Sequence, residues 1–281
     1  MFRGSETEEK KWFPSLKVSA RFATPRIATG DPGRMVRLFL SQAHHPGTVQ
    51  RRRSRLFGGD HENPPGSEET ADFLRLLQRI PPTADLVVLS EHPAASASIE
   101  TLRNLATANR QVIVSALGFS RRGEAAHNTV AVAVPDAVPV LIHKVSFSAE
   151  DQEQAKEGRL LRGDRIVIFD SSIGRFCVLN CHEYTHASII KMLAGQKIDT
   201  LIVTSFNPAW QLYQEYGHAD IHRLFCFVVL CNIGDYGGSS VLAPFSKLGP
   251  QGGAVSVGGS LFSAQGPSDL GNPRAPVGRT A

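Results

Sequence analysis

The arrangement of apolar runs along the chain is the feature that most restricts its fold. Short runs typical of strands alternate with segments whose apolar residues recur at helical spacing, which favours a layered α/β fold. Two pairs of runs, 129–134 with 138–143 and 165–169 with 175–179, are separated only by turn residues and are predicted to be hairpins. Hairpins are incompatible with a purely parallel sheet, so we expect mixed sheets with helices on their outer faces.

The other elements follow from the same patterns. Residues 85–90 form a short apolar run typical of a strand buried on both faces, and the run ends on Glu91. Further strands are expected at 35–42, 111–116, 200–204, 227–231 and 240–243, with possible strands at 16–20 and 254–262. Helices are expected at 67–80, 99–109, 185–194 and 212–225.

The chain of 281 residues has neither an internal repeat nor an interior linker, so one domain is expected over 35–262. Residues 1–34 mix charges, Pro and Gly and are predicted to be an irregular extension, while 263–281 are predicted to be a flexible tail. With 42% apolar and 20% charged residues, the chain is not expected to be disordered.

Other features of the composition restrict location and partners. No window approaches the roughly 20 apolar residues of a membrane span, and the N-terminus lacks the apolar region of a secretory signal. Four cysteines are too few for a disulfide scaffold, so we expect a cytoplasmic protein. The net charge of +4 is mild, and the basic run 51–55 lacks interleaved aromatic residues. A solvated loop is therefore favoured there over a phosphate or nucleic-acid site.

Three residues suited to joint chemistry occupy similar positions relative to the strands. Glu91 and Lys144 each end a predicted strand, and Cys181 lies between a strand and a helix. Active sites of layered α/β folds gather at strand ends. A carboxylate there could take the thiol proton, while an ammonium and the backbone N–H of His182 could stabilise an oxyanion. The helix N-terminus beyond Cys181 would favour a thiolate. Singly, these residues have ordinary explanations: a solvated acid, a surface lysine and a buried thiol.

Several segments, in order, resemble the carbon–nitrogen hydrolase (nitrilase) superfamily, over about residues 35–245. They are 85–91, 127–129 with 142–145, 174–183, 193–205, 223–232 and 237–244. The resemblance implies a four-layer α-β-β-α sandwich and hydrolysis of a small amide, nitrile or carbamoyl compound. It also implies that Glu91 is the general base, that Lys144 supports the oxyanion and that Cys181 forms a thioester. No metal or organic cofactor is expected.

The family resemblance leaves one acid open and shows two departures. Many members have a second glutamate after the lysine; Glu150 and Glu153 compete here, and we favour Glu153 because Gly158 follows it as in the family's pattern. Where the family often has an aromatic residue after the nucleophile, this chain has His182, and no Pro follows soon after. Glu183 matches an acid commonly found two positions after the nucleophile, with helix capping as the competing role.

One further cluster and one aromatic residue admit more than one interpretation. Cys177, Cys181, His182 and His186 are close in sequence, but Cys177 lies within a predicted strand and no second ligand pair has zinc-finger spacing, so no metal site is expected. Trp210 either borders the substrate site or packs in the core.

Function and assembly each retain an alternative. The first hypothesis is a hydrolase; the second is a non-catalytic module that keeps the fold and recognises a small amide or another protein. The presence of Glu91, Lys144 and Cys181 together favours the enzyme. The helices 185–194 and 212–225 carry more apolar residues than one core-facing stripe requires, which predicts a homodimer through them. Packing of both helices on the sheet is the alternative.

Overall fold

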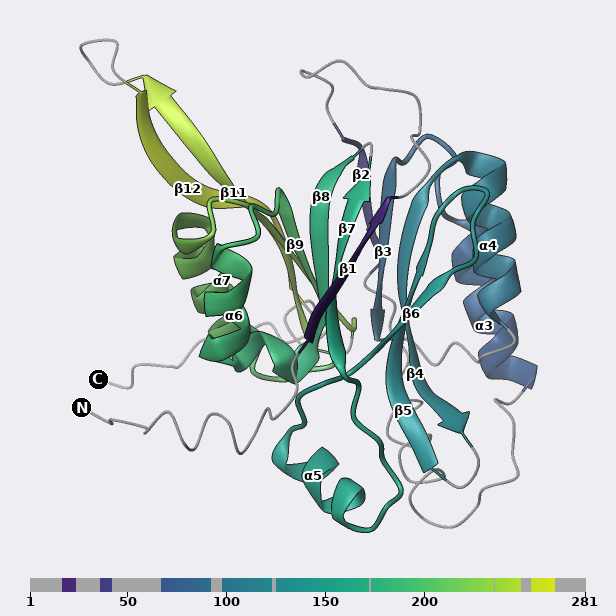
Figure 1. Ribbon diagram of the computed structural model, residues 1–281. Coiled ribbons are helices and arrows are strands. Elements are labelled where there is room, and N and C mark those ends of the chain that lie inside the picture. Colours follow the sequence, from purple (N-terminus) through teal and green to yellow (C-terminus); the bar gives the residue numbers. More distant parts are fainter. Residues whose placement is uncertain are drawn as a thin grey trace, which may run out of the picture.

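Two β-sheets pack face to face, with helices on both outer faces (Figure 1). The computed structural model describes residues 17–23, 36–41, 67–91, 98–122, 125–171, 173–234, 236–248 and 254–265. Within them, a seven-stranded sheet has the order β1-β7-β8-β9-β10-β11-β12, and a five-stranded sheet has the order β2-β3-β4-β5-β6. Helices α3 and α4 cover the five-stranded sheet, and α6 and α7 cover the seven-stranded sheet. The expected α-β-β-α sandwich with mixed sheets is confirmed.

The elements have the following bounds. The strands of the five-stranded sheet are β2 Leu38–Ser41, β3 Leu86–Glu91, β4 Val112–Arg122, β5 Ala125–Ala133 and β6 Val140–His143. Those of the seven-stranded sheet are β1 Lys17–Ala23, β7 Arg165–Ser171, β8 Gly174–Asn180, β9 Thr200–Ser205, β10 Phe227–Asn232, β11 Gly237–Leu248 and β12 Ala254–Gln265. The helices are α3 Ser67–Gln78, α4 Ser98–Asn109, α5 Ala149–Lys156, the 3-10 turn η1 Cys181–Thr185, α6 Ala187–Ala194 and α7 Trp210–Arg223.

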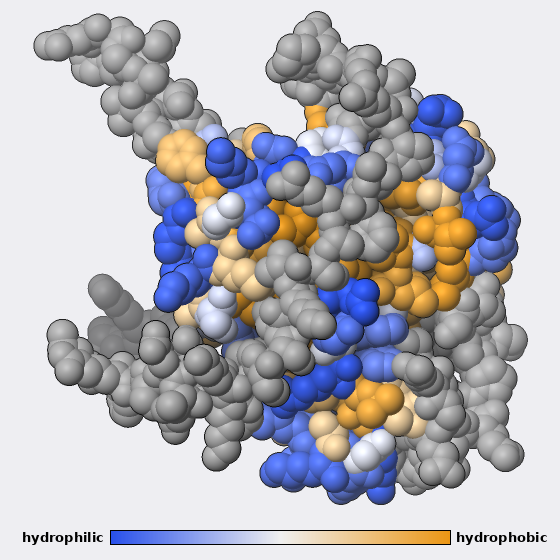
Figure 2. Space-filling view, in the orientation of Figure 1, coloured by the Kyte–Doolittle hydropathy of each residue, from blue (hydrophilic) through white to orange (hydrophobic). Residues whose placement is uncertain are grey.

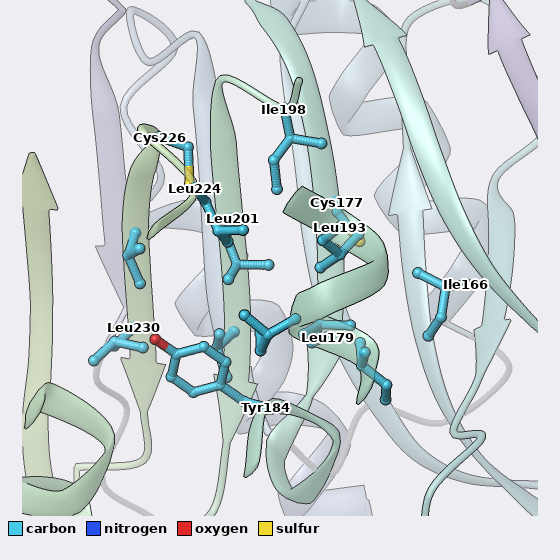
Figure 3. Packing of buried hydrophobic residues seen from close by; sticks show 14 of the residues in the cluster. Ile166, Cys177, Leu179, Tyr184, Leu193, Ile198, Leu201, Leu224, Cys226 and Leu230 are labelled. Carbon is cyan, nitrogen blue, oxygen red and sulfur yellow. The ribbon is translucent and has the colours of Figure 1, made fainter. Parts of the chain in front are cut away.

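Alternation of side chains along the strands produces three apolar cores, one at each junction between layers. On β3, Val88 faces the other sheet, whereas Val87 and Leu89 face α3 and α4. On β8, Val178 faces the other sheet, whereas Leu179 lies in the core beneath α6 and α7. Figure 3 shows this last core, with Leu179, Leu193 and Tyr184 close together. Burial on both faces explains why these strands are continuous apolar runs rather than alternating ones.

Parallel and antiparallel pairing together bring strand ends to one edge. Strand β3 is parallel to both β2 and β4, and β8, β9 and β10 are parallel in register, with Asn180 opposite Thr204 and Asn232 opposite Ser205. The predicted hairpins are confirmed as the antiparallel pairs β5–β6 and β7–β8. The residues that follow β8, β9 and β10 therefore lie beside one another, which is where Cys181 is found.

Some sequence expectations differ from the structure. Helix α5 was not predicted, because its sequence has no apolar stripe, and the helix expected from 185 begins at Ala187 after the turn η1. The possible strand at 16–20 is β1, which pairs with β7, so part of the expected irregular extension belongs to a sheet. The basic run 51–55 and residues 266–281 lie outside the described residues. None of the described helices is long and apolar enough to cross a membrane.

The apolar residues on which the dimer prediction relied are mostly used within the chain. Ile189 and Leu193 of α6 and Tyr213 and Ile221 of α7 are buried against the sheet, whereas Leu212 is 41% exposed. The alternative, in which both helices pack on the sheet of their own chain, thus accounts for most of the apolar excess on α6 and α7. Exposed apolar side chains occur elsewhere too: Figure 2 shows an apolar area over the β5–β6 hairpin, where Val138 and Leu141 are exposed.

Candidate functional site

The side chains of Glu91, Lys144 and Cys181 lie near one another where strands of the two sheets end. Glu91 is the last residue of β3, Lys144 directly follows β6 and Cys181 directly follows β8. The Lys144 amine is close enough to the other two for both to influence its pKa, and Cys181 is influenced in turn by Lys144 and Glu91. The convergence expected from the strand ends is present in the structure.

Lys144 is a buried ammonium held by a buried carboxylate. Its Nζ donates to Oδ2 of Asp151 over 2.7 Å, and the two side chains are 4% and 3% exposed. Burial alone lowers the pKa of Lys144, but its interactions with the acidic groups of Asp151, Cys181 and Glu91 outweigh this effect, so the pKa is raised overall. The group therefore stays positively charged beside Cys181 across the physiological pH range.

The acid that contacts Lys144 is Asp151, which was not among the predicted site residues. Glu153, which the sequence favoured as second acid, lies on the exposed face of α5 and pairs with Lys156 over 2.7 Å. Glu150 is exposed as well. Asp151 points inward because it occupies the third position of α5, where it completes a capping box with Ser148. The signal in the sequence was this Ser-x-x-Asp pattern.

Cys181 occupies a tight turn with an unusual backbone. Its φ of 49° lies in the left-handed region, which is costly for a non-glycine residue and occurs preferentially at functional sites. Its Sγ lies 3.9 Å from the carbonyl oxygen of Phe206 and 3.7 Å from the hydroxyl of Tyr213. Helix α6 begins at Ala187, after the 3-10 turn η1, so its N-terminus lies further along the chain from Cys181 than the predicted start at 185.

The environment of Cys181 keeps it a thiol in the resting site. Burial raises its pKa, Lys144 lowers it, and the carboxylate of Glu91 raises it again, with a net upward direction. A nearby base is therefore needed before the sulfur can attack an electrophile. The other three cysteines are buried in the cores.

Glu183 connects the segments that carry Cys181 and Lys144. Its carboxylate accepts from the backbone N–H of Asn180 over 2.7 Å and from that of Val145 over 2.6 Å. These two donors directly precede Cys181 and directly follow Lys144. Burial raises the pKa of Glu183 to about 7, although the hydrogen bonds to its ionised form act in the opposite direction. Glu183 thus caps η1, as the competing interpretation held, and also sets the spacing of the site.

Two asparagines link the acid to the nucleophile segment. The amide of Asn128, on β5, donates to Oε1 of Glu91 over 3.4 Å and its Oδ1 accepts from Nδ2 of Asn180 over 2.7 Å. Asn128 belongs to the segment 127–129 that carried the family resemblance, but no role was assigned to it from the sequence. These contacts orient the Glu91 carboxylate through residues that are not themselves among the three proposed reacting groups.

The remaining candidates are uncharged neighbours of the site. His182 and His186 meet edge to face with ring centroids 5.0 Å apart, and His186 also contacts the hydroxyl of Ser146. Burial lowers the pKa of both, that of His186 to about 4, so both are neutral at pH 7. Trp210 packs on Gly238, where an added Cβ would lie 2.4 Å from the Trp210 Cβ. No group of three metal-binding side chains occurs among the described residues.

Comparison with known proteins identifies the fold. No family sequence profile matches this chain, and no curated protein matches it in sequence. Solved structures do match. An amidase from Nesterenkonia sp. is similar with a TM-score of 0.53 at 14% identity, over 83% of this chain and 94% of the amidase. Saccharomyces cerevisiae Nit3, a member of branch 10 of the nitrilase superfamily, is similar with a TM-score of 0.52 at 17% identity, over 80% and 89%.

A carbon–nitrogen hydrolase from Helicobacter pylori is similar as well, with a TM-score of 0.52 at 16% identity, over 80% of each chain. In one variant of the Nesterenkonia amidase, acrylamide has undergone Michael addition at the active-site cysteine. The chain therefore has the fold of the carbon–nitrogen hydrolase (nitrilase) superfamily, as the sequence resemblance implied.

Proposed function

We propose that this chain hydrolyses a carbon–nitrogen bond of a small amide through a thioester on Cys181. The observation that carries the proposal is the buried cation beside the thiol: Lys144 is held 2.7 Å from Asp151 while it faces both Cys181 and Glu91. Burying an ion pair costs free energy that its own attraction often does not offset, so a use for the Lys144 charge accounts for its presence in the interior. The fold shared with amidases supports the same function, as does the partial exposure of Cys181, since the other three cysteines are buried.

The first half of the proposed reaction forms the acyl-enzyme. Glu91 takes the proton of the Cys181 thiol as Sγ bonds to the carbonyl carbon, and the carbonyl π electrons move to oxygen. The resulting oxyanion accepts hydrogen bonds from the Lys144 ammonium and from the backbone N–H of His182. When the carbon–nitrogen bond breaks, the proton on Glu91 passes to the leaving amine, and a thioester remains on Cys181.

The second half releases the acid. Glu91 removes a proton from water as the water oxygen attacks the thioester carbon, and the sulfur leaves as the tetrahedral intermediate collapses. The proton on Glu91 then returns to the thiolate, so the site is regenerated. Asp151 takes the place that the sequence suggested for Glu153: it is a positioning residue that fixes the Lys144 ammonium by the hydrogen bond described above.

Release of ammonia tests this proposal directly. Purified protein is assayed against aliphatic amides, ω-amides, carbamoyl compounds and nitriles, with the Cys181→Ala variant as the control for background hydrolysis. We expect Cys181-dependent release from at least one small amide, and mass spectrometry of the quenched reaction to find the acyl group on the peptide that contains Cys181. Binding of an amide without any turnover by wild-type protein would favour the alternative, a non-catalytic module of the same fold.

Assembly and location complete the proposal. We propose a cytoplasmic homodimer that pairs through the outer surface of α6 and α7, where Leu212 is exposed, and Phe225 and Phe227 are exposed just beyond α7. Light scattering at micromolar concentration checks the assembly. A mass near the monomer value of 30.5 kDa at all concentrations would contradict it.

A further inference from the structure

Helix α7 brings a tyrosine hydroxyl to the sulfur of Cys181. Tyr213 is buried in the core under α6 and α7, yet its hydroxyl oxygen lies 3.7 Å from Sγ, within hydrogen-bond range for sulfur. Its ring packs against the ring of Tyr184 with centroids 5.7 Å apart, so the direction of the hydroxyl is fixed by packing. A hydroxyl held this way requires little reordering when charge develops on the sulfur.

The side chain of Asn207 is a second hydrogen-bonding neighbour of the Tyr213 hydroxyl. The side-chain oxygen of Asn207 accepts the backbone N–H of Ala209 over 2.8 Å, and the Asn207 amide group can donate to the Tyr213 hydroxyl. While Cys181 is a thiol, either the Tyr213 hydroxyl or the thiol can be the donor of their contact. A thiolate can only accept, so the bond from Tyr213 to Sγ forms fully once Cys181 is ionised.

A second network holds the loop that supplies these groups. The Asn232 side chain accepts from the backbone N–H of Asn207 over 2.9 Å and donates to its carbonyl oxygen over 2.8 Å. The same residue accepts from Ser205 over 3.0 Å. The loop between β9 and α7 is therefore clamped on both sides of the carbonyl of Phe206, which itself lies against Sγ.

From this geometry we infer that Tyr213 is a further catalytic residue of the site: it donates a hydrogen bond to the thiolate form of Cys181 and is itself oriented by Asn207. The inference rests on the proposed function for its place in a reaction, but the contact is a property of the free protein. The charged groups that face Cys181 are Lys144, from the segment after β6, and Glu91, from β3. Tyr213 adds a neutral donor from helix α7.

The test measures the rate of Cys181 alkylation by iodoacetamide as a function of pH in Tyr213→Phe and wild type, with the rate of Cys181→Ala subtracted as background. The midpoint of the curve of rate against pH gives the pKa of the Cys181 thiol. Loss of one hydrogen bond to the thiolate is expected to move this midpoint upward by about one pH unit, a tenfold change in the ionisation constant. At pH 7 the rate should fall several-fold, while the plateau at high pH is retained or rises, because a more basic thiolate is intrinsically more nucleophilic.

Tyr216→Phe is the matched control, since it removes the hydroxyl of another tyrosine on α7 that packs on Tyr184 and not on Cys181. Its midpoint should equal that of wild type. Asn207→Ala retains Tyr213 and should give a smaller shift in the same direction, which keeps the test open if Tyr213→Phe folds poorly. An unchanged midpoint in Tyr213→Phe, or equal shifts in Tyr213→Phe and Tyr216→Phe, would overturn the inference.

The same experiment separates this inference from the proposed function. Alkylation requires no amide substrate. If the midpoint is shifted in Tyr213→Phe but wild-type protein releases no ammonia from any amide, the role of Tyr213 is supported and the proposed hydrolase activity is contradicted. Conversely, if wild-type protein hydrolyses an amide but the midpoint of Tyr213→Phe is unshifted, the hydrolase activity is supported and the role of Tyr213 is contradicted.

Discussion

The two sheets supply opposite kinds of chemistry to the candidate site. The five-stranded sheet and the segment after it bring the charged groups, Glu91, Lys144 and Asp151. The seven-stranded sheet and its helices bring the thiol of Cys181 and the neutral hydroxyl of Tyr213. The charged side is tied by an ion pair, whereas the neutral side is tied by hydrogen bonds and by aromatic packing.

This division shows why the site needs both sheets. A buried thiol among neutral neighbours has a raised pKa and is unreactive, and a buried cation with no anion nearby is costly. When the sheets pack together, the Lys144 charge is partnered on its own side and acts on Cys181 across the junction. Predictions that remove one group from each side therefore test whether the two halves cooperate.

The largest effect is expected on the neutral side, from Cys181→Ala. Turnover should fall by about 10⁴-fold or more, because no covalent intermediate can form. The fold should be retained, since the variant removes only one sulfur atom. Ammonia release measures the loss of turnover, and circular dichroism checks that the fold is retained. Residual turnover above about one per cent would move the nucleophile away from Cys181.

On the charged side, Glu91→Gln should reduce kcat by about 10² to 10⁴-fold, because the variant keeps the shape but cannot accept the thiol proton. Its amide also alters the contact with Asn128. Steady-state kinetics on the best substrate measure the change. If only KM rises, Glu91 binds the substrate and another group is the base.

A smaller effect is expected when the anchor of the cation is removed. Asp151→Asn should lower kcat by about 10 to 100-fold with little change in KM, because the Lys144 ammonium loses its orientation. Since Asp151 raises the pKa of Lys144, the alkaline loss of activity should begin at lower pH in this variant. Breaking the buried pair should also cost about 3 kcal/mol of unfolding free energy.

Glu153→Gln is the matched control for Asp151→Asn. It lies on the same helix but pairs with Lys156 at the surface, where both side chains are about two-thirds exposed. Such a pair contributes less than about 1 kcal/mol, and its loss should leave kcat, KM and the pH profile unchanged. Equal effects of the two substitutions would mean that α5 acts as a whole rather than through Asp151.

The same contrast explains what could be predicted from the sequence. Glu91, Lys144 and Cys181 were identifiable because each terminates an apolar run, and strand ends converge. Asp151 was missed because α5 has no apolar periodicity; only its capping pattern with Ser148 marked the helix. Spacing alone therefore favoured Glu153, which faces away from the site.

On the neutral side the limitation was different. Tyr213 fits the apolar stripe of α7, and Ile221 on the same helix is indeed buried, so periodicity marks it as a core residue. Its ring does pack in the core, and only the hydroxyl reaches the sulfur of Cys181. A sequence pattern records which face of a helix is buried, but not which polar atom lies at the end of a buried ring. For a related reason, the pattern did not show that one sheet face absorbs most of the apolar residues of α6 and α7.

Among the residues of the site, the smallest effect on turnover is expected for Glu183, which joins the two sides. Glu183 has a folded-state pKa of about 7 against an ordinary value of 4.5. A carboxyl whose pKa is raised by folding binds more protons in the native state, so stability is greatest below the unfolded value and falls as pH rises from 4.5 to 7. The difference of 2.5 units corresponds to about 3 kcal/mol.

Glu183→Gln should remove this contribution, because the amide is neutral throughout, while one of the two backbone contacts, to Asn180 or Val145, is kept. Urea unfolding at several pH values between 4.5 and 8 should therefore give a flatter dependence for the variant than for wild type. Comparison of the two curves cancels the titration of all other carboxylates, which are common to both. Turnover at pH 7 should fall by less than about tenfold, since Glu183 contacts no reacting atom. Parallel stability curves would show that Glu183 ionises normally in the folded protein, and that the junction between the charged and neutral sides tolerates its charge at no cost.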